Sequence, residues 1–226
     1  MSDGVGRIHE KIRSFQKKYY LNLFIKGLIL TLSILIGYFL LASLVEHNLW
    51  LGQGARLLIF LTFFGVAGYC IFRFLNQPLR WWLAKRGLNE EEAARLIGGS
   101  LPSVKDRLVN LIQLASSDKS SALTYASVQQ KSHEFEPLSF ESVIDLKQNR
   151  KYLKYLAIPV VFILIVLLIN RNIIFQSTER IVNFNREYSP AAPFKFIIVN
   201  ESLTAFYNED FTVKLRLDGG AIAHTV

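Results

Sequence analysis

The stretch YLKYLAIPVVFILIVLLIN, residues Tyr152–Asn170, decides how the rest of the chain is interpreted. Tyr155 to Asn170 contain no charged residue, and Lys154 lies between tyrosines at one end, where a snorkelling amine and aromatic rings belong. A helix over this stretch is about 27 Å long, close to the ~30 Å hydrocarbon layer of a bilayer. Pro159 lies near its start, where a membrane helix tolerates a kink. We predict a transmembrane helix over 152–170; the alternative is a buried helix of a large soluble protein.

Two more apolar runs precede this stretch, Gly27–Val45 and Leu57–Leu75. The first is too long and begins too late for a signal peptide, so we predict an uncleaved anchor. Residues 46–56 form a short turn between the runs, and 27–75 is therefore a two-span hairpin. The chain is 51% hydrophobic and 19% charged, so apolar and charged segments alternate along it. The sequence indicates three spans that contact the lipid bilayer.

The distribution of bases predicts the orientation of these spans. Residues 1–26 carry six bases against two acids, and residues 73–154 carry thirteen against nine. The turn 46–56 and the segment after the third span are each neutral. Basic flanks stay in the cytoplasm, so the pattern predicts a multi-pass protein of the bacterial inner membrane with a cytoplasmic N-terminus and an external, periplasmic C-terminus.

Residues 1–26 are interpreted as a basic amphipathic segment. Ile8, Ile12, Phe15 and Tyr19 share one helical face, and bases occupy the others. Such a helix can lie on the anionic inner leaflet and run into the first span. An ordinary juxtamembrane helix with a solvated charged face is the open alternative.

Residues 76–151 are predicted to form a small cytoplasmic helical domain. Asn89 followed by three glutamates is typical of a helix start, with Glu92 at the capping-box position. This helix is expected to end at Gly98-Gly99, and a second to begin at Pro102-Ser103 with Ser103 as its cap. A third helix is expected over Ala122–Phe135.

Beyond the third span, residues 171–192 are expected to be a partly helical connector and 193–226 the first strands of an external β region. Strands are predicted at Phe194–Val199, Leu203–Phe206 and Phe211–Leu217, of which the last alternates strictly between apolar and polar residues. A β-sandwich needs about seven strands. The fold class is therefore a mainly α membrane protein with the start of a β-sandwich-like region, and we expect the chain to be truncated.

Sequence motifs give no support for an enzyme, and the prediction is a non-enzymatic protein without cofactor. The chain has no P-loop, dinucleotide fingerprint, H-E-x-x-H or C-x-x-C motif, and a single cysteine, Cys70. The bases cluster beside apolar runs, which argues against nucleic acid as a partner. We also expect the spans to hold no buried acid–base pair, which disfavours a transporter.

The two helices predicted around residues 90 and 105 carry the candidate contact residues. They are interpreted as helix-packing residues or, alternatively, as a docking face for a cytoplasmic partner. Asp106 suits a helix N-terminus, whereas Arg107 gains nothing there and is expected to meet an acid in this domain or on a partner. The five candidates, for docking or inter-helix contact, are Arg95, Asp106, Arg107, Asn110 and Gln113.

The pattern A-A-R-x-I around Arg95, L-P-x-x-x-D-R-L-x-N-x-x-Q-L from Leu101, and Asn149-Arg-Lys-Tyr resembles the bacterial membrane proteins of domain of unknown function 4175. The resemblance covers nearly the whole chain, and those proteins are generally much longer. It implies a link to MoxR-type AAA+ ATPases and von Willebrand A-like proteins. No nucleotide motif stands in this sequence, so the ATPase label of some members is not carried over.

Together these patterns predict a membrane scaffold or sensor of unknown process. It would join an external β region to a cytoplasmic helical domain that docks a MoxR-type AAA+ or von Willebrand A-like partner, and a homo-oligomer is a further expectation. The alternative is a subunit of a membrane channel or transporter.

Overall fold

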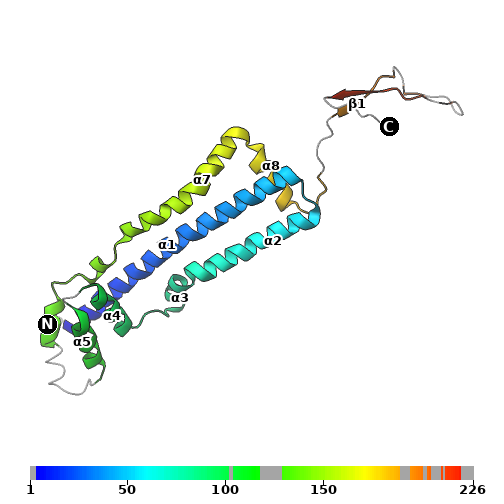
Figure 1. The fold of residues 1–226 in the computed structure, drawn as a ribbon. Helices are drawn as coiled ribbons and strands as arrows, with labels where there is room; N and C mark the ends of the chain where they lie inside the picture. The colour runs from blue at the N-terminus through cyan, green and yellow to red at the C-terminus, as the bar shows by residue number, and fades with distance from the viewer. Residues whose placement is uncertain are drawn as a thin grey trace.

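The computed structural model describes residues 4–101, 104–117, 129–188, 194–200, 203–204, 210 and 212–219. This part of the chain is mainly helical (Figure 1). Three of its helical stretches are long and apolar enough to cross a membrane: Gly6–Leu49, Gln53–Ala84 and Phe140–Asn170. Leu168 is 87% exposed and Phe72 is 71% exposed. Side chains of this kind favour a lipid environment.

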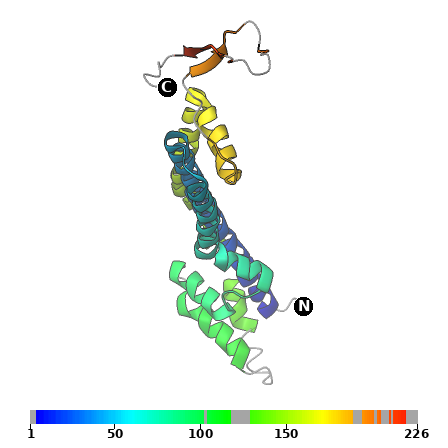
Figure 2. The same cartoon turned by 90° about the vertical axis from the view of Figure 1, so that its right-hand side faces the viewer.

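Helix α1 (Gly4–Leu49) is the central element of the fold. It contains no proline, and its 46 residues form one continuous helix, about 69 Å long at 1.5 Å per residue. The predicted N-terminal segment and first span are therefore a single helix. It lies between α2 (Gln53–Cys70) and α7 (Arg150–Asn170), as Figure 1 shows. Figure 2 shows the three helices edge-on, overlapping in one layer.

The second long stretch changes its helical type near one end. After α2 the chain forms a π-helix, η1 (Ile71–Leu75), and then α3 (Asn76–Ala84). Gly27 of α1 lies against this segment so closely that a Cβ there would be 2.5 Å from the carbonyl oxygen of Phe74. Glycine is thus required at this crossing. The left-handed Lys85, at φ 51°, ends α3.

A helical domain surrounds the first turns of α1. It consists of α4 (Glu90–Ser100), α5 (Lys105–Ser117) and the short 3₁₀ helices η2 (His133–Phe135) and η3 (Phe140–Val143); η4 (Leu146–Asn149) leads into α7. The core is made of buried apolar residues from all these elements except η4: Ile8, Ile12, Phe15, Ala93, Ala94, Ile97, Val104, Leu108, Leu111, Ile112, Phe135 and Phe140.

The apolar face of residues 1–26 is therefore covered by protein, and the prediction that it lies on the membrane surface is wrong in this respect. Ile12 and Phe15 are each 1% exposed within the core. Lys11 donates through Nζ to the carbonyls of Phe135 and Leu138 at 3.1 and 2.8 Å, and so fixes the chain before η3. An apolar stripe on a helix suits a neighbouring helix as well as a bilayer, so sequence periodicity does not distinguish the two.

The predicted helix start at Asn89 is confirmed as a reciprocal capping box. The Glu92 backbone N–H donates to Asn89 Oδ1 at 2.7 Å, and the Asn89 N–H donates to Glu92 Oε2 at 3.0 Å. The helix runs past Gly98-Gly99 to Ser100. Ser103 and residues 122–128 of the third expected helix lie outside the described residues.

The chain turns back on itself after α7. Asn170 Oδ1 accepts a hydrogen bond from the backbone N–H of Asn172 at 2.9 Å, and α8 (Asn172–Val182) returns to pack on α1 and α2. Strands β1 (Phe194–Ile198) and β2 (Leu215–Gly219) then pair antiparallel, with Phe196 opposite Leu217. The described residues form a two-stranded sheet, and a sandwich is not shown. The expected strand at Leu203–Phe206 lies partly outside them.

Candidate functional site

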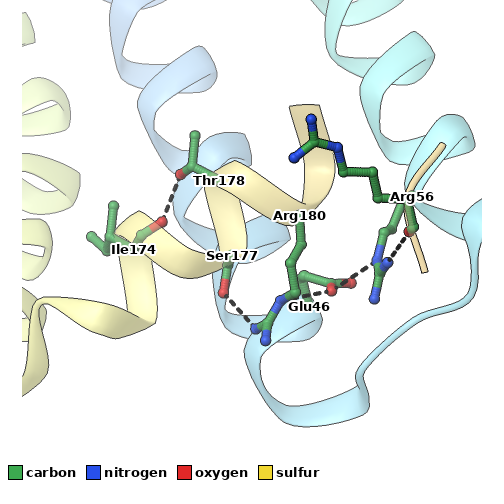
Figure 3. A network of polar contacts seen from close by, with 7 residues as sticks. Glu46, Arg56, Ile174, Ser177, Thr178 and Arg180 are labelled. Atoms are coloured by element: carbon green, nitrogen blue, oxygen red, sulfur yellow. Dashed lines mark hydrogen bonds and ion pairs between the residues drawn. The ribbon is translucent and has the colours of Figure 1, made fainter. Parts of the chain in front are cut away.

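Three buried charged side chains meet where α1, α2 and α8 come together (Figure 3). Glu46, Arg56 and Arg180 are 0%, 1% and 3% exposed. Glu46 Oε1 lies 3.0 Å from Arg56 Nε and 3.1 Å from Arg180 Nε. One carboxylate oxygen is thus shared by two guanidinium groups. We call Glu46, Arg56 and Arg180 the charge cluster.

The local sequence explains how the first two members meet. Glu46 lies in the last turn of α1 and Arg56 in the first turn of α2. The connection between the helices is short and includes Trp50 at φ 46°. Consecutive antiparallel helices joined in this way place the end of one beside the start of the next. The third member arrives from a distant part of the chain, because α8 folds back from the end of α7.

Aromatic rings and hydrogen-bond acceptors surround the two arginines. The Arg180 guanidinium carbon lies 4.0 Å from the Trp50 ring centroid, and Arg180 Nη2 lies 3.4 Å from Ser177 Oγ. Arg56 donates through Nη1 to the Arg186 carbonyl at 3.3 Å and lies 5.0 Å from the Tyr188 ring centroid. Cation–π contacts of this kind contribute about 0.5–2 kcal/mol each, and more when desolvated.

The charge cluster is not electrically balanced. Two bases surround one acid, which leaves an excess positive charge. Among the described residues, Glu46 Oε2, Arg56 Nη2 and Arg180 Nε are buried without a hydrogen-bond partner, so Arg180 contacts Glu46 as an ion pair without a hydrogen bond. Burying charges is costly unless they are paired, and removing one partner of a buried pair costs about 3–5 kcal/mol. The arrangement therefore holds α8 in one position on the α1–α2 hairpin.

The buried pair Glu46–Arg56 lies in the predicted turn 46–56, directly beside the predicted spans Gly27–Val45 and Leu57–Leu75, and the expectation of no buried acid–base pair within those spans is not contradicted by it. Glu46 and Arg56 both lie within the long apolar stretches Gly6–Leu49 and Gln53–Ala84. In the sequence they appear as an ordinary neutral turn. The sequence signal for this pair is an acid at the start and a base at the end of a short turn, because so short a connection keeps the two residues near each other. Nothing in the sequence signalled Arg180.

The predicted contact residues lie on the exposed side of α4 and α5. Gln113 donates to Glu91 Oε1 at 2.8 Å and thus bridges the two helices, as expected for that residue. Arg95 also contacts Glu91, at 2.5 Å, so its ion pair lies within α4. Asp106 and Asn110 are exposed.

Arg107 forms an ion pair with Glu134 at 3.0 Å, and both side chains are more than half exposed. One of the two expectations for Arg107, an acid of the same domain, is therefore confirmed. The side chains of Arg95 and Gln113 hold the pKa of Glu91 below its ordinary value through hydrogen bonds, that of Arg95 being the stronger influence. All five candidates are exposed on α4 or α5, and the pairs given above for Arg95, Arg107 and Gln113 are internal to the helical domain.

The described residues contain no group of three or more His, Cys, Asp or Glu side chains that could hold a metal ion. The fold and the charge cluster define a layer of three long apolar helices joined to a small helical domain. Comparisons with protein-family models, curated proteins and solved structures gave no match. The resemblance to domain of unknown function 4175 stays a prediction.

Proposed function

We propose that this protein is a non-enzymatic scaffold or sensor of the bacterial inner membrane, which couples an external β region to a cytoplasmic helical domain. The observation that carries the proposal is the continuity of α1. Its first turns supply Ile8, Ile12 and Phe15 to the core of the helical domain, and its last turn supplies Glu46 to the charge cluster. A continuous helix transmits displacement or rotation between its ends without an intervening hinge.

The connection on the external side runs through α8. This helix carries Arg180 and ends at Val182; the next strand along the chain is β1, which begins at Phe194 and pairs with β2. A force or ligand acting on the β region would first act on α8 and then, through Glu46, on α1. The charge asymmetry of the sequence supports placing the basic helical domain in the cytoplasm.

The cytoplasmic output would be a protein partner on the α4–α5 surface. Arg95, Asp106, Arg107, Asn110 and Gln113 present both charge signs and amide groups there. Because Arg107 already pairs with Glu134, an acidic partner group would compete with an exposed ion pair worth about 0–1 kcal/mol. That is a small cost for a partner to overcome. A MoxR-type AAA+ or von Willebrand A-like protein is the proposed partner.

Co-purification with a co-expressed MoxR-type ATPase tests this proposal. Arg107→Glu should lower the recovered ATPase, and the swap Arg107→Glu with Glu134→Arg should not restore it, because the partner meets a reversed surface. Arg180→Gln at the far end should lower recovery too. If the Arg107→Glu variant and the Arg180→Gln variant each recover as much ATPase as the unmodified chain, both docking and coupling are rejected. Arg186→Gln, an exposed base near α8, is the matched control for Arg180.

The alternative function is a subunit of a channel or transporter, and one observation favours it. Ionisable residues buried within spans often mark ion pathways. The charge cluster lies at the ends of α1 and α2 and is packed by Trp50 and Tyr188, which suits a structural contact better than a conducting path. The channel or transporter function would be favoured if liposomes containing the protein showed an ion flux and the Glu46→Gln variant abolished that flux.

A further inference from the structure

A second polar feature lies at the opposite end of the three-helix layer, between α1 and the π-helix. It is a pocket of about 250 Å³, whose polar lining includes Lys26, Arg73, Asn76 and Gln77 and whose apolar lining includes Leu30 and Phe72. We call it the Lys26–Arg73 pocket. Figure 1 shows α3, which follows η1 in the chain, at the end of the helix layer nearer the helical domain.

The charge of this pocket is positive and is not offset by its neighbours in the chain. No Asp or Glu occurs from Lys11 to Val45 or from His47 to Asn89, segments that include all the residues lining the pocket. Tyr152 of α7 approaches Lys26 with its ring, the centroid lying 5.1 Å from Nζ. A ring of this kind holds the ammonium group in place without neutralising it.

The shape of the pocket depends on the close crossing at Gly27. The π-helix brings the Phe74 carbonyl against α1 where residue 27 has no side chain. π-Helical turns are rare and occur frequently at functional sites. Here the π-helical turn places Arg73 in the lining of the Lys26–Arg73 pocket, to which α1 contributes Lys26.

The position of the pocket indicates the kind of ligand. Lys26 directly precedes the apolar run Gly27–Val45, and Arg73 lies near the end of the run Leu57–Leu75, so both bases lie where these runs end. Leu30 and Phe72 extend the lining toward those runs. Basic pockets between transmembrane helices on the cytoplasmic side bind anionic lipid head groups. From this geometry we infer that the Lys26–Arg73 pocket binds the phosphate of an anionic phospholipid, whose acyl chains lie along Leu30 and Phe72.

This inference rests on the proposed membrane insertion but not on the proposed coupling. The probe is phosphatidylglycerol, and the reference is zwitterionic phosphatidylcholine. Native mass spectrometry of the full chain in neutral detergent measures how much of each lipid is bound. We expect at least about tenfold preference for phosphatidylglycerol, since each basic residue near an anionic lipid contributes appreciably to binding. Lys26→Gln with Arg73→Gln should abolish the preference.

Two controls make the result specific. Arg80→Gln with Arg86→Gln removes the same charge from exposed positions beyond the pocket and should keep the preference, as should Lys26→Arg. Equal loss in the Arg80/Arg86 variant, or equal binding of both lipids to the unmodified chain, overturns the site. Displacement of phosphatidylglycerol by excess inorganic phosphate assigns the pocket to a soluble anion and overturns the lipid assignment. Carbonate extraction of membranes measures insertion separately. Failure of the proposed membrane insertion is therefore distinguishable from failure of the lipid site.

Discussion

Arg180 Nε of α8 lies 3.1 Å from Glu46 Oε1 at the end of α1, and both side chains are buried. This contact joins the segment that follows the third long helix to the first long helix. Because Arg56 uses the same oxygen, α1, α2 and α8 depend on one carboxylate. The consequences of removing that carboxylate are therefore predictable.

Replacing Glu46 with glutamine should destabilise the protein by about 3–5 kcal/mol, because two buried arginines then lack a counter-charge. Thermal or denaturant unfolding in detergent measures the effect. Glu187→Gln removes an exposed acid from the same end of the chain and should change stability by less than about 0.5 kcal/mol. Replacing Glu46, Arg56 and Arg180 together with methionine should recover much of the loss, since no charge remains buried. Equal stability of Glu46→Gln and the unmodified chain would contradict a buried charge cluster.

Gly27→Ala should destabilise the contact between α1 and η1. The new Cβ would lie 2.5 Å from a backbone oxygen, which cannot move as a flexible side chain does, and overpacking of this kind costs about 1–3 kcal/mol. Gly37→Ala on the same helix is the control, because a Cβ there meets nothing within 4 Å. That variant should be neutral or slightly stabilising. Similar stabilities of the two variants would show that the helices are farther apart than described.

The Glu91 carboxyl should titrate below its ordinary value near 4.5. Arg95→Gln should raise its pKa more than Gln113→Ala does, because Arg95 is the larger cause of the lowering. Because the pKa of Glu91 is lower in the folded state, its ionised carboxyl stabilises the fold at pH values above the ordinary pKa. This stabilisation is lost as the pH falls through the lowered pKa. An NMR titration of the carboxyl carbon measures both variants. A larger effect of Gln113→Ala would reverse the assignment.

Topology is testable with reporters. A reporter active only outside the cytoplasm should be active when fused after Pro193 and silent after Ser120, because the bases flanking the spans favour a cytoplasmic helical domain. Correct insertion is checked for both fusions by carbonate extraction of the membranes. The opposite pattern of activity would reverse the proposed orientation.

Local sequence signals predicted the individual helices well. The uncharged run after Tyr155 lies within α7, and the Asn89–Glu92 spacing produced the capping box. Strand β1 lies within the predicted strand Phe194–Val199, whereas β2 shares only residues 215–217 with the predicted strand Phe211–Leu217 and continues to Gly219. These features depend on residues a few positions apart, so periodicity and capping chemistry suffice to predict them.

The features that the sequence did not predict depend on tertiary contacts. Arg180 reaches Glu46 only because the turn at Asn170–Asn172 sends α8 back onto α1. The π-helix η1 (Ile71–Leu75) itself forms the close crossing with Gly27 of α1, and no local propensity indicates it. The choice between lipid and protein as the neighbour of Phe15 likewise depends on the position of α4 and α5.

Hydrogen–deuterium exchange of the full chain in lipid nanodiscs tests the coupling most directly. Arg180→Gln weakens the hold on α8 and leaves the helical domain unmodified, and Arg186→Gln is the control at an exposed position. If α1 transmits the change, exchange should increase in α8 and also in the core segments of α4 and α5, while the control leaves both unchanged. An increase confined to α8, with α4 and α5 exchanging as in the unmodified chain, would contradict the coupling of the two ends.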